Sequence, residues 1–255
     1  MVAFLFGSAI GSFINVAVYR LPIMLTRDWQ HQSLEILADA TGENSLVADL
    51  ARRLPNRVTP FNLLVPNSTC PHCNVGIKPW HNIPIAGYFL IKGRCANCRQ
   101  TISRRYPLVE VTTATLSALV IVILGPNLQG LAGCFLLWSL IALALIDYDT
   151  QLLPDDITIP FTWIGLVINY FGVITSFDAA FWGACMGYMT LWTVFQLFKL
   201  VTGKEGMGYG DFKMLAMLGA WLGVQTVPLI IVLSSFAGAA VGGTMIIFGR
   251  DKAKP

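Results

Sequence analysis

Two aspartates stand at the ends of apolar segments, where a membrane-spanning chain meets water. Asp147 closes the apolar run 144–146, and Asp211 follows a turn that carries three glycines. A carboxylate at that depth costs free energy unless it has a partner or a function. Two aspartates in one site can split their pKa values, so that one takes a proton from water while the other polarises a carbonyl. The pair therefore indicates a carboxylate dyad able to activate water.

The composition indicates an integral membrane protein. The 255 residues are 55% hydrophobic and only 12% charged, and the mean hydropathy is +0.63. A soluble domain carries about 25% charged residues. The net charge of +3 is small, so we expect the lipid bilayer as a partner and no nucleic acid.

Seven apolar segments predict an all-α polytopic fold, a multi-helix transmembrane bundle. Lys and Arg are absent from the segments near 125–130, 175–178 and 224–228. Because cytoplasmic loops collect Lys and Arg, these three loops face outside and both aspartates face the cytoplasm. The apolar segments cover about 2–19, 107–124, 130–146, 157–175, 179–198, 212–224 and 227–248, of which the sixth is short.

This pattern divides the chain into three parts. Residues 1–19 form the first transmembrane helix, residues 20–106 a small cytoplasmic insertion, and residues 107–250 a six-helix transmembrane domain. The first segment lacks a basic stretch before it and a clear cleavage site, so it is expected to be retained rather than removed as a signal peptide. The insertion begins with a polar, partly helix-like half, Arg27 to Arg57, and continues with a cysteine module at 66–102.

The cysteine module predicts a structural zinc site. Cys70 and Cys73 form one Cys-x2-Cys knuckle, and Cys95 and Cys98 form a second one after 21 residues. Two such knuckles place four thiolates around one metal ion, and a reducing cytoplasm disfavours disulfides. The alternative is a set of free or redox-active thiols.

The remaining histidines and cysteines are expected to stay outside the zinc site. His72 and His81 are near the module, but a lone histidine beside four cysteines is more often a bystander. Cys134 and Cys185 lie within apolar segments and are expected to be small apolar fillers.

Several other polar residues have a structural interpretation. Asp149, Asp155 and Asp156 are expected to be hydrated at the interface or to cap the next helix. Asn15 is expected to hydrogen-bond a neighbouring helix, and Glu110 to pair with a basic residue.

The candidate dyad also has an alternative interpretation. Asp147 and Asp211 would then be surface carboxylates paired with Lys213 or Arg105. Pro154 is expected to end the helix that carries Asp147. The glycines before Asp211 are expected to allow close backbone approach and unusual dihedral angles.

Taken together, the motifs resemble the bacterial type IV prepilin peptidases, a family of bifunctional leader peptidases and N-methyltransferases. The resemblance extends over nearly the whole chain, although relatives usually continue beyond the point that corresponds to Pro255 into another apolar span. The matching stretches are 11–16, 19–22, the two cysteine knuckles, 105–110, Asp147 with 153–155, and 208–213.

The resemblance implies an aspartic membrane protease of the Gly-x-Gly-Asp type with Asp147 and Asp211 as its catalytic pair. Such an enzyme cuts a prepilin or pseudopilin at the cytoplasmic face of the bacterial inner membrane, after the glycine that ends a basic leader. It then methylates the new amino terminus with S-adenosylmethionine. The family ties methyl transfer to the insertion and points to Gly93 and Arg94.

Two other functions remain open at the level of the sequence. In an ion or metal transporter the aspartates would bind a cation, but transporter sites usually lie midway through the membrane and not at one face. A peptidase without methyl transfer is the second, and the intact cysteine knuckles argue against it. The sequence indicates no oligomeric state.

Overall fold

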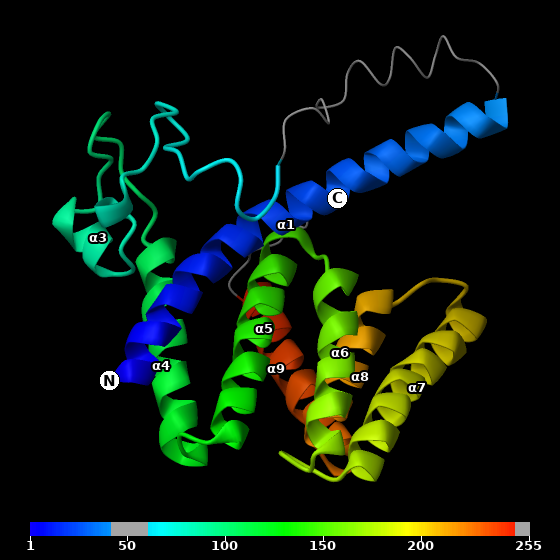
Figure 1. Cartoon of the computed structure of the whole chain (residues 1–255). Coiled ribbons are helices and arrows are strands. Elements are labelled where there is room, and N and C mark those ends of the chain that lie inside the picture. The colour runs from blue at the N-terminus through cyan, green and yellow to red at the C-terminus, as the bar shows by residue number, and fades with distance from the viewer. Residues whose placement is uncertain (42–60, 248–255) are drawn as a thin grey trace. The chain divides into compact units, whose positions relative to one another are not determined.

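The described part of the chain is mostly helical. A computed structural model describes residues 1–41 and 61–247 (Figure 1). Within these ranges there is no strand, only two isolated bridges that pair Thr69 with Gly76 and Arg94 with Thr101. The all-α, multi-helix membrane fold predicted from the sequence is confirmed. The elements are α1 (Val2–Thr41), η1 (Pro79–His81), α3 (Ala86–Leu90), α4 (Arg105–Leu124), α5 (Leu128–Thr150), α6 (Asp155–Tyr170), α7 (Phe177–Thr202), α8 (Tyr209–Leu222), η2 (Val224–Thr226) and α9 (Val227–Ile247).

Five helical stretches in the described ranges are long and apolar enough to cross a membrane, namely those of α1, α4, α5, α7 and the stretch from η2 into α9. The expected segments 157–175 and 212–224 also form helices, α6 and α8. These two have 16 and 14 residues, fewer than the roughly 20 that a full span needs. Residues 248–250, at the end of the expected transmembrane domain, lie outside the described ranges.

Helix α1 does not end where its apolar run ends. We expected the first helix at 2–19, but α1 continues to Thr41 and contains Pro22. Hydropathy marks the part of a helix that lies in lipid, whereas the backbone hydrogen bonds continue as long as the residues favour a helix. The polar stretch from Arg27 is therefore helical up to Thr41, and the rest of the expected polar half, to Arg57, lies outside the described ranges.

The fold consists of two compact units. The first spans Met1–Leu152 and the second begins at Leu153. In the first unit α1 packs against α4 and α5; in the second, α8 packs against α6 and α7. The six helices expected in one transmembrane domain are thus divided, with α4 and α5 in the first unit and α6 to α9 in the second.

Small residues bring α1 and α4 together. A Cβ on Gly7 would lie 2.8 Å from Cβ of Ser117, and one on Gly11 would lie 2.8 Å from Cα of Glu110. Glycines four residues apart share one helix face and let two membrane helices approach closely. One turn further along this face, Asn15 donates to the backbone oxygen of Tyr106 at 3.2 Å. The expected hydrogen bond of Asn15 to a neighbouring helix is confirmed.

A second glycine pair, which our sequence analysis missed, joins α7 to α8. A Cβ on Gly183 would collide with the carbonyl of Gly219, and one on Gly187 would lie 2.7 Å from the carbonyl oxygen of Leu215. The signal was present in the sequence as glycines at i and i+4. This contact fixes the axis of α8, the helix whose first turn carries Asp211.

The other end of α8 is attached to α6 by a buried amide. Asn169 donates to the backbone oxygens of Ala220 and Trp221, both at 2.9 Å. Its side-chain oxygen accepts from the backbone of Ile174 and Thr175 at 3.1 and 3.0 Å. One fully buried side chain therefore satisfies four backbone groups at helix ends, where intrahelical partners are lacking.

Gly183→Ala tests the contact between α7 and α8. The added methyl group must displace the backbone at Gly219, so we expect the free energy of unfolding to fall by about 2 kcal/mol or more. Unfolding in mixed micelles measures this. Gly238→Ala in α9 is the matched control, because no atom lies within 4 Å of its added Cβ. Equal losses in both variants would contradict the proposed role of the contact.

Candidate functional site

Asp147 lies one turn before the end of α5, and its side chain is exposed. The helix ends at Thr150 because Gln151 adopts a left-handed conformation with φ 54°, and its N–H donates to the oxygen of Asp147 at 2.8 Å. Pro154 then precedes the first residue of α6. The break expected at Pro154 is present, and Gln151 sets where it begins.

The neighbouring Asp149 has a defined structural partner. Its Oδ1 accepts from Nη1 of Arg105 at 2.7 Å, and its Oδ2 lies 2.7 Å from Nη2 in the same ion pair. A bidentate pair of this kind fixes orientation as well as charge, and it ties the end of α5 to the start of α4. Residues two apart on a helix point roughly 200° apart, so the pair that holds Asp149 leaves Asp147 on another side of α5.

Asp211 is half-buried in the first turn of α8. Gly208 is the residue that precedes this helix, and its oxygen accepts from the backbone N–H of Asp211 at 3.3 Å. The first turn of a helix is a favourable place for a carboxylate, because the N–H groups there point outward. Lys213, considered above as a partner for the candidate dyad, binds both oxygens of Asp155 at 2.7 and 2.6 Å.

The glycine turn before Asp211 packs closely on its surroundings. A Cβ on Gly210 would lie 2.7 Å from Cβ of Leu153, and one on Gly206 would lie 2.7 Å from the ring of Phe198. The expected close approach is confirmed. The expected unusual dihedral angles are not found, since Gly206, Gly208 and Gly210 are not among the glycines with positive φ.

The two aspartates belong to different units, Asp147 to the first and Asp211 to the second. Their approach to a common site is therefore still a prediction. The mutual packing of Leu153 with Gly210 and of Asp155 with Lys213 lies wholly inside the second unit.

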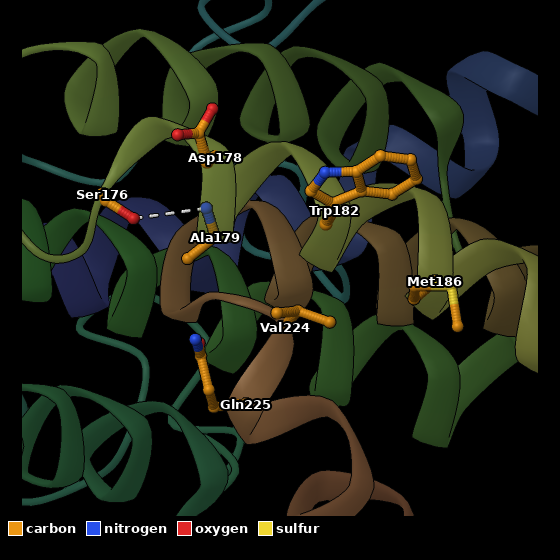
Figure 2. A pocket seen from close by; sticks show the side chains of 7 residues that line it. All are labelled: Ser176, Asp178, Ala179, Trp182, Met186, Val224 and Gln225. Atoms are coloured by element: carbon orange, nitrogen blue, oxygen red, sulfur yellow. Dashed lines mark hydrogen bonds between the residues drawn. The ribbon is translucent and has the colours of Figure 1, made fainter.

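Figure 2 shows a hollow between the start of α7 and η2. There the Ser176 hydroxyl accepts from the N–H of Ala179 at 3.3 Å and caps α7. The hollow lies by the end of α8, opposite to the turn that carries Asp211, and Asp178 is the one carboxylate in its lining. This hollow therefore does not contain a pair of carboxylates. Its lining residues are Ser176, Asp178, Ala179, Trp182, Met186, Val224 and Gln225.

The four cysteines of the two knuckles converge as predicted. Their sulfur atoms all lie within 4.8 Å of one another, with Cys70 and Cys98 at 3.8 Å and Cys73 and Cys95 at 4.0 Å. A tetrahedral site with Zn–S bonds of about 2.3 Å needs sulfurs about 3.8 Å apart. The spacing within the cluster is thus close to that of a tetrahedral zinc site.

Both knuckles use the same backbone turn. The N–H of Asn74 donates to the oxygen of Cys70 at 2.8 Å, and the N–H of Arg99 donates to that of Cys95 at 3.0 Å. Asn74 and Arg99 have φ of 54° and 60°, which lets each turn close. The two halves of the module are therefore matched, one holding each pair of thiols.

Backbone hydrogen bonds favour thiolates at this cluster. The N–H of Val75 and then the amide of Asn97 lower the pKa of Cys73 to about 6, and the backbone at Cys98 lowers the pKa of Cys95. The N–H of Gln100 acts in the same direction on Cys98, but desolvation and the neighbouring sulfurs outweigh it and raise the pKa of Cys98 to about 11. A bound cation would remove this repulsion between like charges.

Gly93 and Arg94 begin the second knuckle. Gly93 is buried with φ 65°, and a Cβ there would lie 2.7 Å from the hydroxyl of Tyr88. Backbone conformation and packing therefore already require glycine at this position. The side chain of Arg94 is exposed.

Arg20 has a structural role that the sequence did not indicate. This residue is buried on α1, where its guanidinium donates to the backbone oxygens of Asn62 at 2.9 Å and Pro66 at 2.6 Å. It thereby fastens the start of the cysteine module to α1. No local pattern indicated this, because the partners are backbone atoms more than 40 residues away in the chain.

The prediction that Glu110 pairs with a basic residue was wrong. Its buried carboxylate accepts from the backbone N–H of Ile85 at 2.7 Å, where we had expected a basic side chain. Ile85 has φ 61°, a conformation that is unfavourable for a β-branched residue. The bond attaches the cysteine module to α4. Because the carboxylate is buried, losing this donor would cost the free energy of leaving a buried acceptor unpaired.

Comparison with known proteins identifies similarity over nearly the whole chain. The family described as "Bacterial Peptidase A24 N-terminal domain" matches residues 5–124, and the "Type IV leader peptidase family" matches residues 134–243. No solved structure gives a significant match.

Several curated proteins named "Prepilin leader peptidase/N-methyltransferase" are similar to the chain. That of Stutzerimonas stutzeri is 49% identical over 244 residues, which cover 96% of this chain and 80% of the relative. That of Pseudomonas putida is 50% identical over 96% of this chain and 80% of the relative. For that of Aeromonas hydrophila, the identity is 46%, over 99% of this chain and 83% of the relative.

Glu110→Ala tests the attachment of the cysteine module to α4. The change leaves the Ile85 N–H without its acceptor, so we expect a loss of about 1–3 kcal/mol in local stability. Hydrogen exchange at residues 85–90, read by mass spectrometry, should become faster. Glu110→Gln keeps an acceptor oxygen and should retain most of the protection. Unchanged exchange in the alanine variant would show that the bond does not hold the module.

Proposed function

The chain belongs to the type IV leader peptidase family, and we propose that it cleaves the leaders of prepilins or pseudopilins and methylates the amino terminus thus released. Both halves of the chain match the family, its N-terminal domain and its peptidase region. The relatives' names include both activities, which favours the bifunctional enzyme over the peptidase alone. Family membership also argues against the transporter alternative.

The observation that carries the peptidase assignment is the meeting of two motifs in the second unit. Leu153 packs on Gly210, and Asp155 binds Lys213, so the turn that follows Asp147 in sequence lies against the turn that carries Asp211. Asp147 precedes Leu153 by six residues, a length of chain that reaches roughly 20 Å at most. This reach permits a shared site, in which we expect the two carboxylates to lie within roughly 4–8 Å.

The proposed chemistry needs the two carboxylates in different protonation states. The ionised aspartate takes a proton from a water molecule, whose oxygen forms a bond to the scissile carbonyl carbon. The protonated aspartate donates a hydrogen bond to the carbonyl oxygen and stabilises the charge that develops there. When the C–N bond breaks, the aspartate that took the proton from water gives it to the leaving amine, and the pair returns to one ionised and one protonated carboxyl group.

The location of the dyad matches a substrate that is itself a membrane helix with a basic leader. Such a helix lies in the bacterial inner membrane with its cleavage bond at the cytoplasmic face, the side on which Lys and Arg cluster in this chain. Asp149 and Asp155 in the acidic stretch from Asp147 to Asp156 are neutralised by Arg105 and Lys213, so attraction of the leader by charge would depend on Asp147 and Asp156. Cleavage after the glycine that ends the leader then exposes the new amino terminus at the same face.

Methyl transfer is assigned to the insertion with S-adenosylmethionine as methyl donor. We carry over Gly93 and Arg94 for this step. Gly93 lets the backbone turn closely into the second knuckle, and the exposed guanidinium of Arg94 suits a carboxylate such as that of an amino-acid-like donor. The new amino group must be deprotonated to accept the methyl group.

We propose zinc as the ion held by Cys70, Cys73, Cys95 and Cys98. The spacing of the sulfurs and the lowered pKa of Cys73 and Cys95 support four thiolate ligands. When bound, the ion supplies a cross-link between the two knuckles. A module of this size has little core of its own, so metal binding contributes much of its folding free energy.

Asp147→Asn and Asp211→Asn test the peptidase assignment. Each should abolish leader cleavage, since an amide can neither accept the proton of water nor complete the shared-proton pair. The assay incubates purified enzyme with a prepilin peptide and labelled S-adenosylmethionine and reads cleavage and label together.

Asp149→Asn and Asp155→Asn are the matched controls for these two variants. Their carboxylates already serve the pairs with Arg105 and Lys213, so the loss of cleavage should be partial. If an asparagine at 147 or 211 left cleavage near the wild-type rate, that residue would be excluded from the dyad.

Elemental analysis tests the zinc proposal and should find about one zinc per chain. Serine in place of any one of the four cysteines should lower the metal content and disorder residues 66–102 first. Methyl transfer should then fail before cleavage, because the dyad is carried by α5 and α8. If metal removal stopped cleavage while methyl transfer to a pre-cut peptide persisted, the division of the two activities would be wrong.

A further inference from the structure

The cysteine module has an unusual charge pattern. Residues 61–106 contain no aspartate or glutamate. Such a surface repels a basic leader and attracts anions, so its partner is unlike the substrate proposed above. The basic residues of the module are Lys78, Lys92, Arg94 and Arg99; Arg104 and Arg105 follow it, and Arg105 is paired with Asp149.

Large apolar side chains project from the same module. Phe89 and Leu90, at the end of α3, are each 68% exposed, and Trp80 is 55% exposed. The five residues of α3 cannot bury these groups against one another. Exposed aromatic and aliphatic groups beside basic ones are typical of segments that lie in the membrane interface.

The depth of α3 follows from its attachment to α4. Ile85, which precedes α3, donates to Glu110, and Glu110 is five residues into α4, about 7.5 Å along its axis. Figure 1 shows α3 beside the start of α4. The headgroup region of a bilayer is about 5–7 Å thick on each side, and Leu108 of α4 is exposed at this level. The start of α3 is therefore level with the membrane edge.

We propose that residues 83–92, the interfacial segment, bind the membrane surface and recognise anionic phospholipid. Phe89 and Leu90 enter the boundary between headgroups and acyl chains, while Lys92 and the neighbouring Lys78 face the lipid phosphates. Depth, apolar exposure and the absence of acidic residues each favour lipid over a protein partner. The segment would hold the cysteine module against the bilayer beside α4.

Photo-crosslinking of the full chain tests this proposal. Phe89 is replaced by p-benzoylphenylalanine, an aromatic residue at an exposed position, and the protein is placed in nanodiscs of phosphatidylcholine with or without phosphatidylglycerol. Zinc content and leader cleavage verify that the variant is folded. We expect lipid adducts by mass spectrometry, with a several-fold higher yield when phosphatidylglycerol is present.

Ile36 provides the matched control position, because it is also 68% exposed and lies in the polar part of α1. The same probe there should give a several-fold lower lipid yield. Lys78→Gln with Lys92→Gln should remove the preference for phosphatidylglycerol at Phe89. A yield at Phe89 equal to that at Ile36, adducts with protein only, or no dependence on phosphatidylglycerol would overturn the proposal.

Discussion

A polar side chain that reaches into the apolar part of a membrane needs a partner inside the protein, because lipid tails offer none and unpaired charge there is costly. Much of this structure follows from that constraint. Arg105 and Asp149 neutralise each other between α4 and α5, and Lys213 and Asp155 do so between α8 and α6. These pairs place helix ends with a precision that apolar contacts alone do not give. Asp149 and Asp155 therefore have structural partners, whereas Asp147 and Asp211 are the carboxylates that we propose for catalysis.

Close approach of helices meets a second requirement of the membrane. Lipid tails are as apolar as leucine, so helices associate through tight packing and hydrogen bonds rather than through exclusion of water. Each unit contains one such contact, Gly7 and Gly11 against α4, and Gly183 and Gly187 against α8. In the second unit this contact and the two hydrogen bonds that Asn169 donates to Ala220 and Trp221 hold the C-terminal half of α8. The first turn of α8, with Asp211, is thereby presented on a rigid helix.

The cysteine module illustrates how a small, charged element is joined to a membrane domain. Its four cysteine sulfurs lie together at about the spacing of a zinc site, and the zinc ion that we propose there would hold the module together. Its position depends on two polar contacts to membrane helices, from Arg20 on α1 and from Glu110 on α4. Loss of metal and loss of an attachment would therefore have different effects, the first on the fold of the module and the second on its location.

The sequence by itself determined the membrane class, the cluster of four cysteines and the resemblance to leader peptidases. Those features depend on local composition and fixed spacing, which survive without knowledge of the fold. The spacing of Gly183 and Gly187 indicates a close contact between two helices, which we did not predict. Asn15 was predicted correctly, since an amide within an apolar helix has few partners other than another helix.

Only the tertiary structure decided which polar groups pair with each other. Glu110 accepts a hydrogen bond from a backbone N–H of the module, and Arg20 donates to two backbone carbonyl oxygens more than 40 residues away. The full length of α1 could not be predicted from the apolar pattern either. Hydropathy indicates which part of a helix contacts lipid, but not how far the helix continues in water. The physical reason is common to all three. When the partner of a side chain is distant in the chain, or is a backbone group, the sequence around that side chain shows no pattern that identifies it.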